Sequence, residues 1–356
     1  MKKNKKINVE NLNNRTKGAI FLVLYWLIII SLILLSDASG LTIKYFGNHK
    51  YLPFIFFNTF LLLNSVIIYF ISKEINQTFL PKHSLLNNLF IFFIISMFTL
   101  GNIYSYILVP YGFISDTKQI RIIFAILSTL SIAIVYLIMF IYFLYYKIGL
   151  KKSLYGALCA TIVIFFLISF CYLSILRYVY LIILLFIIPV INDTFAYFGG
   201  NFFGKHKMCA NLSKNKTWEG FFTGIIFSII TAIIFILMFF INAQSNLNKS
   251  ILWSMYGWQI NNICYDNFFY DGKWWVTIIF SILILNIISP FSDLLFSKFK
   301  RVCQVKDFSN LIKGHGGILD RIDSLSLVFV SYFFISLIIN VSLSNNLLQF
   351  VNICAY

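Results

Sequence analysis

Apolar runs of membrane-spanning length recur along the whole chain. A helix needs about 20 mostly apolar residues to cross the hydrocarbon core of a bilayer. Nine runs come close to that length or exceed it, at 18–36, 52–72, 86–109, 122–146, 153–174, 178–192, 219–241, 274–291 and 325–345. Hydrophobic residues make up 60% of the chain and charged residues only 11%, whereas about a quarter of a soluble domain is charged. The sequence therefore predicts an all-α polytopic membrane protein with about nine transmembrane helices, a single domain over 18–356 behind a basic tail at 1–17.

The net charge of +16 is spread over the short loops between these runs. This spread argues against nucleic acid as a partner and favours anionic lipid head groups or phosphate-bearing substrates. With nine spans and a cytosolic N-terminus, the cytosolic segments hold 21 of the 28 Lys and Arg residues, and the opposite side holds 7. Cytosolic loops of membrane proteins carry such an excess. We therefore expect the N-terminus and the two most polar internal loops, 193–218 and 292–324, to lie in the cytosol.

The twelve acidic residues are distributed differently. Half of them fall in those two loops and at the adjoining helix ends, namely Asp193, Glu219, Asp293, Asp307, Asp320 and Asp323. The other half stand singly in loops or in the tail, as solvated charges do, namely Glu10, Asp37, Glu74, Asp116, Asp266 and Asp271. Acids concentrated in two loops of an apolar chain indicate a functional site there.

Asp320 and Asp323 are three residues apart, so on a helix their side chains share one face. Two carboxylates on one face repel each other unless a cation lies between them. Mg²⁺ takes oxygen ligands and is typically held by one or two carboxylates together with substrate phosphates. Pairing of the two acids with Arg321 and nearby lysines at a helix start is the alternative. Asp193 ends an apolar run, a costly depth for a carboxylate unless it serves a metal or a polar cavity.

Basic and glycine residues surround this pair. Lys300, Arg301 and Lys306 precede it, and both residue types bind phosphate; a positively charged membrane anchor is the alternative. The loop Gly314–Gly317 contains three glycines, which permit close approach of the backbone to phosphate. His315 within it either contacts phosphate or donates a proton, or fixes the loop by a hydrogen bond.

The other polar loop leads into an apolar run through Ser213, Lys216 and Thr217. A helix start with free backbone N–H groups, a hydroxyl and a lysine is suited to binding an anion. Glu219 has an alternative explanation, since an acid at a helix N-terminus is favoured by the helix dipole.

Together these segments resemble the CDP-diacylglycerol synthase family, also called phosphatidate cytidylyltransferases. The family signature is matched at Ser297, Lys300, Arg301, Lys306, Asp307, His315, Gly316, Gly317, Asp320, Arg321 and Asp323. A second element, S-P-x-K-T-W-E-G, is matched at Ser213, Lys216, Thr217, Trp218, Glu219 and Gly220, and an N-D-x-x-A-Y element at Asn192, Asp193, Ala196 and Tyr197. These matches place the catalytic half of the domain at about 190–325.

The chain departs from the family pattern at three places. Lys313 and Lys214 stand where the family usually has proline, and Asp293 matches an acid typical of bacterial members. The run Lys306–Phe308 and the insertion 242–273 are instead similar to the eukaryotic branch, which implies an endoplasmic reticulum membrane. An N-x-S sequon at Asn248 leaves glycosylation open.

The resemblance implies an enzyme that converts CTP and phosphatidate to CDP-diacylglycerol and pyrophosphate with Mg²⁺, a step of phospholipid biosynthesis. The roles it implies fall into three groups. Metal ligands are Asp320, Asp323, Asp293 and Asp193; further catalytic residues are Lys300, Arg301, Lys306, Asp307, His315 and Arg321; substrate-binding residues are Ser213, Lys216, Thr217, Glu219, Ser297, Gly316 and Gly317. A second cation and a homodimer are left open.

Two other functions are compatible with such a chain. Another CTP-using lipid enzyme, such as a polyprenol kinase, would transfer a bare phosphate and leave no nucleotide on its product. An ion-coupled transporter would use the same acids but predicts two corresponding halves with broken helices, and no internal repeat is visible in the sequence.

Overall fold

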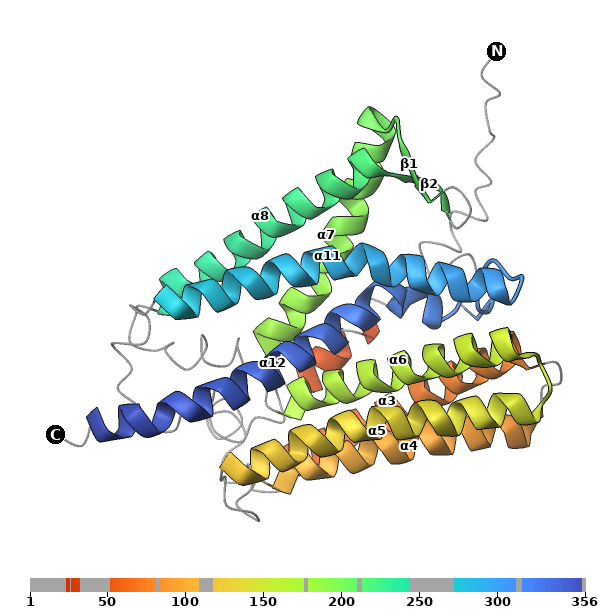
Figure 1. Cartoon of the computed structure of the whole chain (residues 1–356), viewed down its shortest axis with the longest axis horizontal. Coiled ribbons are helices and arrows are strands. Elements are labelled where there is room, and N and C mark those ends of the chain that lie inside the picture. Colours follow the sequence, from red (N-terminus) through yellow and green to blue (C-terminus); the bar gives the residue numbers. More distant parts are fainter. Residues whose placement is uncertain are drawn as a thin grey trace. The chain divides into compact units, whose positions relative to one another are not determined.

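The structure is a computed structural model that describes residues 24–25, 27–32, 52–80, 84–108, 118–175, 179–209, 213–243, 272–311 and 316–353. Its elements, drawn in Figure 1, are α3 (Leu52–Phe79), α4 (Leu85–Leu108), α5 (Lys118–Tyr145), α6 (Leu150–Ile175), α7 (Val179–Phe203), β1 (Lys207–Cys209), β2 (Ser213–Thr217), α8 (Trp218–Ala243), α11 (Gly272–Val302) and α12 (Leu319–Ile353). The predicted basic tail and the sequon at Asn248 lie outside the described residues. Most described residues are helical, which agrees with the predicted all-α class.

Four of the described helices are long and apolar enough to cross a membrane: Leu150–Ser174, Leu181–Phe203, Trp218–Met238 and Ile278–Val302. They correspond to four of the nine predicted runs. Helices suit this environment because all their backbone N–H and C=O groups pair within the segment. The chain is therefore an integral membrane protein, while the full number of spans stays a prediction.

The helices belong to two compact units that alternate along the chain. The first takes in residues up to Met97, then 143–156 and 300–322; the second takes in 98–142, 157–299 and 323–356. In the first unit, the end of α3 packs on the end of α5, where the ring centroids of Phe79 and Phe143 are 5.7 Å apart. The hydroxyl of Tyr146 donates a 2.6 Å hydrogen bond to Asn87 of α4.

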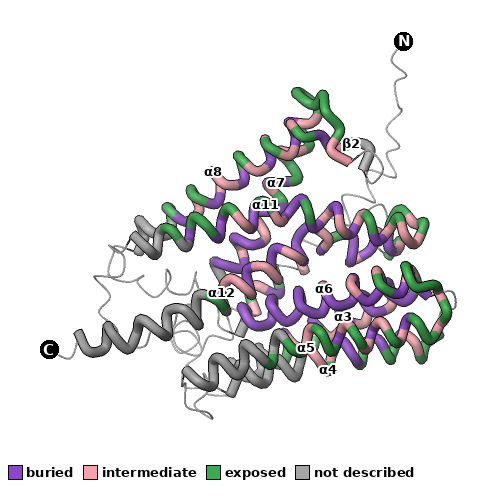
Figure 2. Tube along the Cα trace, in the orientation of Figure 1, coloured by how far each residue is buried: buried purple, intermediate pink, exposed green. Residues whose placement is uncertain are grey.

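The second unit has a core of aromatic rings. The ring of Phe329 on α12 lies with its centroid 5.4, 6.0 and 5.3 Å from those of Phe166, Phe170 and Phe186, which come from α6 and α7. Aromatic edge-to-face pairs at such distances add to the packing of the apolar core. Figure 2 shows that α6 is buried along most of its length, whereas α8 exposes much of its surface.

Small residues let α7 and α8 pack closely in the second unit. A Cβ on Gly199 of α7 would fall 1.8 Å from Oγ1 of Thr223, and one on Gly220 of α8 would fall 2.6 Å from the carbonyl oxygen of Ala196. Larger residues would force the two helices apart. The antiparallel strands β1 and β2 form a short hairpin between these helices, visible in Figure 1 at their common end.

A proline leaves a free backbone acceptor where α7 contacts α11. Pro290 lies inside α11, and a proline has no N–H to donate to the carbonyl four residues before it, here that of Asn286. The amide of the buried Asn192 side chain on α7 donates a 3.0 Å hydrogen bond to that carbonyl oxygen. This bond brings together the segments that carry Asp193 and Asp293.

Candidate active site

Both helices that carry the predicted site extend further than the sequence suggested. The prediction that Asp193 ends an apolar run at the start of a loop is wrong, because α7 continues through it to Phe203. Likewise α11 continues to Val302, so Asp293, Ser297, Lys300 and Arg301 are helical residues, not residues of a loop. Side chains at helical spacing are more precisely placed than side chains on a loop.

Four side chains of the second unit form what we call the aspartate cluster: Asp193, Lys216, Asp293 and Ser324. Nζ of Lys216 on β2 lies 2.5 Å from Oδ2 of Asp293 on α11. The carboxylate of Asp193 on α7 interacts electrostatically with both residues and accepts a hydrogen bond from the side chain of Ser324 on α12. The chain thus places two carboxylates near each other with one ammonium group beside them.

Asp323 is held next to this cluster in the second unit. The hydroxyl of Ser292 on α11 donates to the backbone carbonyl of Asp323 and also contacts the hydroxyl of Ser326 at 3.3 Å. Oδ1 of Asp323 accepts from the backbone N–H of Ser324 at 2.9 Å. These contacts join the start of α12 to α11 one residue before Asp293.

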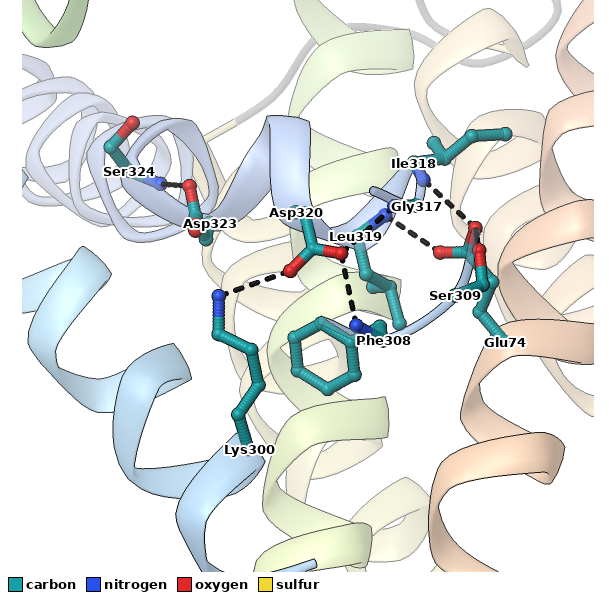
Figure 3. A network of polar contacts seen from close by, with 10 residues as sticks. All are labelled: Glu74, Lys300, Phe308, Ser309, Gly317, Ile318, Leu319, Asp320, Asp323 and Ser324. Atoms are coloured by element: carbon teal, nitrogen blue, oxygen red, sulfur yellow. Dashed lines mark hydrogen bonds and ion pairs between the residues drawn. The ribbon is translucent and has the colours of Figure 1, made fainter. Parts of the chain in front are cut away.

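Asp320 lies in the first unit, in what we call the Asp320 network, which is drawn in Figure 3. The network consists of the carboxylates of Asp320 and Glu74 and the groups that donate to them, from Lys300, Phe308, Ser309, Gly317, Ile318 and Leu319. Oδ1 of Asp320 accepts from Nζ of Lys300 at 3.0 Å. Its Oδ2 accepts from the backbone N–H groups of Phe308 and Gly317, at 2.9 and 2.8 Å. The Asp320 side chain is only 4% exposed, and Lys300 also lies 5.5 Å from the ring centroid of Phe308. Both oxygens of the predicted metal ligand therefore have donors from this chain.

Two glycines are required by this arrangement. Gly316 has a φ of +81°, in the left-handed region, where residues with a Cβ are strained. Gly317 is buried, and a Cβ on it would lie 2.5 Å from Oε1 of Glu74. The prediction that these glycines serve phosphate binding stays a prediction, and the structure adds a packing reason for them.

Glu74 does not behave as the sequence suggested. It was expected to be a solvated loop charge, but it lies in α3 and is only 2% exposed. Burial is the main cause that raises the pKa of its carboxyl above the usual range, against the hydrogen bonds that lower it. The available signal was helical spacing, since Glu74 stands beside the fully buried Ile71 and Ile75 on one face. The five other residues expected to be solvated charges, Glu10, Asp37, Asp116, Asp266 and Asp271, lie outside the described residues.

Thr217 and Glu219 have contacts at the start of α8. Oγ1 of Thr217 accepts from the backbone N–H of Gly220 at 3.2 Å, the bond that an N-cap residue makes. The Glu219 carboxylate accepts from the backbone N–H of His206 at 3.1 and 3.2 Å and contacts Nδ1 of its ring at 2.6 Å. Both residues therefore brace the hairpin and the start of α8, and their contact with substrate stays a prediction.

The remaining predicted residues lie near these groups in the sequence. Four are exposed, namely Arg301, Lys306, Asp307 and Arg321, and Ser297 is half-buried on α11. Ser213 and Lys214 belong to β2, but their side chains lie outside what the structure describes. Lys313, Gly314 and His315 also lie outside the described residues. Two contributors could not be recognised from the sequence: Glu74, and the Asn192 amide at the carbonyl released by Pro290.

The donor chemistry of the aspartate cluster fits a hard cation. Among the described residues, no three His, Cys, Asp or Glu side chains gather as a complete metal site. Mg²⁺ does not need one, because it commonly takes one or two carboxylates and fills its other positions with water and phosphate oxygens. Asp193 and Asp293 supply two such carboxylates, whereas a cation at Asp320 would have to displace Lys300 from Oδ1.

Comparison with known proteins agrees with these segments. Residues 51–339 match the family described as "Cytidylyltransferase family". A phosphatidate cytidylyltransferase of Rickettsia conorii is 36% identical over 154 residues, which cover 43% of this chain and 56% of the relative. One from Haemophilus influenzae is 37% identical over 157 residues, covering 44% and 46%, and one from Staphylococcus haemolyticus is 35% identical over 143 residues, covering 40% and 44%.

These alignments span about half the length of the curated relatives, all three of them bacterial. The family match is much longer and covers most of the chain, residues 51–339. It therefore includes both the Asp320 network, with Glu74, and the aspartate cluster. On that match, the chain belongs to the cytidylyltransferase family.

Proposed function

We propose that this protein is an integral-membrane phosphatidate cytidylyltransferase, which makes CDP-diacylglycerol and pyrophosphate from CTP and phosphatidate. Beyond the family match, the observation that carries the proposal is the aspartate cluster. It joins Lys216 of β2 to Asp293 at 2.5 Å and sets Asp193 close by. Carboxylates for a metal next to an ammonium group for phosphate are what a reaction between two phosphate-bearing substrates requires.

The chemistry needs few proton transfers. An oxygen of the phosphatidate phosphate attacks the α-phosphorus of CTP, one P–O bond forms, and the bond from that phosphorus to the bridging oxygen of the β-phosphate breaks. The leaving group is pyrophosphate. Because the attacking oxygen is already anionic near neutral pH, catalysis depends on positioning and charge neutralisation.

The residues of this chain divide these tasks. Lys216 and Lys300, together with Arg301, Lys306 and Ser213, bind phosphate groups. Asp193 and Asp293 would hold Mg²⁺, and Asp323 and Asp320 would be further ligands by resemblance to the family signature. Bound Mg²⁺ would neutralise the negative charge that gathers on the phosphate oxygens. The remaining signature residues, namely Asp307, His315, Arg321, Ser297, Thr217, Glu219, Gly316 and Gly317, orient the substrates.

The entry routes of the substrates, the orientation in the membrane and the organelle belong to the same proposal. Phosphatidate enters from the bilayer and CTP from the cytosol, with about nine spans and the polar loops on the cytosolic side. A membrane of the endoplasmic reticulum follows from the similarity to the eukaryotic branch alone, whereas the relatives compared above are bacterial. A homodimer and a second cation complete the proposal, and size measurement in detergent and metal titration test them.

The position of the label in CTP tests the reaction directly. Membranes that contain the protein are supplied with phosphatidate, Mg²⁺ and CTP labelled with ³²P on either the α- or the γ-phosphate. Cytidylyl transfer puts the α label into the lipid fraction and the γ label into pyrophosphate. Lipid product that carries the γ label would instead establish a kinase and overturn the proposal.

Two controls complete the test. Omission of phosphatidate or of Mg²⁺ should abolish the lipid product, and an Asp293→Asn variant inserted in equal amount should do nearly the same. No lipid product from either label, in a preparation that is folded and monodisperse, would also contradict the proposal.

A further inference from the structure

We infer that Glu74 is a positioning residue, which caps the start of α12 from a distant helix and thereby fixes Gly316 and Gly317 just before that helix and Asp320 in its first turn. The inference rests on the proposed function for what these residues do, but not for the contacts themselves. Figure 3 shows Glu74 projecting from α3 toward the start of α12.

The contacts of Glu74 are directed at two short segments. Its Oε1 accepts from the hydroxyl of Ser309 at 2.7 Å and from the backbone N–H of Ile318 at 2.8 Å. Its Oε2 accepts from the backbone N–H of Leu319 at 2.8 Å. Both oxygens of a buried carboxylate are thus used on residues more than 230 positions away in the sequence.

The start of α12 needs such a partner. The first N–H groups of a helix have no carbonyl within the helix to bond. An N-cap side chain with an oxygen usually accepts from one of them, but Ile318, whose carbonyl accepts the first helical bonds from Arg321 and Ile322, has no such oxygen. Glu74 supplies the missing acceptor, and its negative charge suits the positive end of the helix dipole.

The carboxylate of Asp320 binds neighbouring residues of the same two segments. This residue accepts from the N–H groups of Phe308 and Gly317, while Glu74 accepts from Ser309, Ile318 and Leu319. Each of the two carboxylates therefore binds both to residues 308–309 and to residues 317–319. Asp320 was expected from the sequence, whereas the acceptor from α3 was not.

Gly317 shows how closely Glu74 approaches. A Cβ at this position would lie 2.5, 2.7 and 2.7 Å from Oε1, Cδ and Oε2 of Glu74. Because these distances are far below a van der Waals contact, any larger residue would push the carboxylate out of its bonds with the α12 amides. The glycine in the predicted phosphate-binding loop is therefore required by Glu74 as well.

A carboxylate is needed at this position, because a glutamine has only one accepting oxygen. In a Glu74→Gln variant, the new amide NH₂ group would face either Leu319 N–H or the Ser309 and Ile318 donors, and a donor facing a buried donor is unfavourable. Glu74→Gln keeps the shape of the side chain and removes this one property, which makes it the informative variant.

Hydrogen exchange tests the inference without any reference to catalysis. We expect Glu74→Gln to speed the exchange of the backbone amides of Ile318 and Leu319, measured in a peptide covering 316–322, by about tenfold or more, since one of these two amides faces a donor in place of its acceptor, with exchange elsewhere unchanged. Ser309→Ala removes one of the three donors and should give a smaller change in the same direction. If Glu74→Gln does not fold, Ser309→Ala takes its place as the test variant for hydrogen exchange.

Kinetics then test what the position of the loop does. If the glycine loop binds the phosphates of CTP, Glu74→Gln should raise the KM for CTP about tenfold and leave the KM for phosphatidate within about twofold. A role in folding alone would lower the number of active molecules and leave both KM values unchanged.

Thr78→Val is the matched control. Thr78 lies one turn further along α3, and its hydroxyl donates only to the carbonyl oxygens of Glu74 and Ile75 within that helix. It should keep normal exchange and normal KM values. Normal loop exchange in Glu74→Gln, or equal changes in Thr78→Val, would overturn the inference. Faster loop exchange in a protein that makes no lipid product would retain Glu74 as the cap and contradict only the proposed reaction.

Discussion

The Asp320 network and the aspartate cluster use the same residue types in opposite ways. In the Asp320 network, the carboxylates of Asp320 and Glu74 receive five hydrogen bonds from backbone or hydroxyl groups and one from Lys300. In the aspartate cluster, Asp193 and Asp293 lie near each other beside Lys216 and a serine. The first arrangement fixes backbone geometry, whereas the second leaves negative charge that a cation can neutralise.

For the proposed reaction, this difference predicts separate tasks for the two groups of residues. Buried carboxylates that accept from N–H groups hold a loop rigidly, since breaking such bonds leaves polar groups unpaired. Carboxylates that repel each other have a higher affinity for a metal ion. Mutations in the aspartate cluster should therefore lower turnover with little loss of stability, whereas mutations of the carboxylates in the Asp320 network should lower stability as well.

The largest effect on turnover is expected in the aspartate cluster. Asp293→Asn removes a proposed Mg²⁺ ligand, so kcat should fall on the order of 100-fold or more. The side chains of Lys216 and Asp293 are 25% and 24% exposed, and the loss of their ion pair is partly offset because Asp193 no longer faces a second carboxylate. The melting temperature in detergent should therefore fall by less than it does in Asp320→Asn.

Lys216→Met should lower turnover as well. Lys205→Met is its control, because Lys205 is an exposed lysine in the short segment between α7 and β1. A melting temperature that falls as steeply as the activity in Asp293→Asn would show that the cluster is a structural element, and the comparison would fail.

Asp320→Asn should affect both properties. The amide can accept at one oxygen only, so Phe308 and Gly317 or Lys300 would lose an acceptor. Removal of one partner of a buried pair costs about 3–5 kcal/mol, which corresponds to a fall on the order of 5 °C or more in melting temperature. Thermal unfolding and CTP turnover, measured on one preparation, check the prediction. Lost turnover without lost stability would place Asp320 with the aspartate cluster.

Gly317→Ala should lower turnover about tenfold, because the new methyl group displaces Glu74 and moves the loop. In a Glu74→Ala background the space is empty, and the same change should cost less. The difference between the two effects is the coupling energy of the pair. Equal effects in both backgrounds would mean that Gly317 acts on substrate and not through Glu74.

Much of the fold class and many of the candidate site residues could be predicted from the sequence. The apolar runs predicted a helical membrane protein, and the signature residues indicated Asp193, Lys216, Asp293, Asp320 and Asp323. Short-range spacing predicts such features because helix formation and membrane insertion depend on local composition. Lys216 and Asp293 were both named, but nothing in the sequence indicated that they form a pair.

The contacts that hold the site together were not accessible in this way. Glu74 stands far from α12 in the sequence, and a single acid at the end of an apolar run is the usual pattern of a solvated charge. Asn192 matched a family element, yet its partner is a backbone carbonyl, which every residue carries. Only Pro290 pointed to this contact, because a proline within a helix leaves the carbonyl four residues earlier without its partner in the helix.

Asn192→Ala should lower stability by a smaller amount. It leaves the carbonyl oxygen of Asn286 buried without its 3.0 Å hydrogen bond, at a cost of about 1–3 kcal/mol. A fall of a few degrees in melting temperature is therefore expected. Pro290→Ala restores the N–H that the carbonyl needs, so the double variant should recover part of the loss. No recovery would mean that Asn192 acts elsewhere.

The smallest expected effect concerns the pH dependence of stability at Glu74. Burial raises the pKa of this carboxyl above its ordinary value of 4.5, so the folded protein holds the proton more tightly than the unfolded chain. Its contribution to stability is therefore fully present below pH 4.5 and is lost as the pH rises through the raised pKa. Glu74→Gln lacks this titration, so the melting temperature of the variant relative to the wild type should rise with pH across that range. Thr78→Val should show no such trend. A difference that stays constant with pH would contradict the prediction, because the hydrogen bonds from Ser309, Ile318 and Leu319 would then fully offset the burial of the charge.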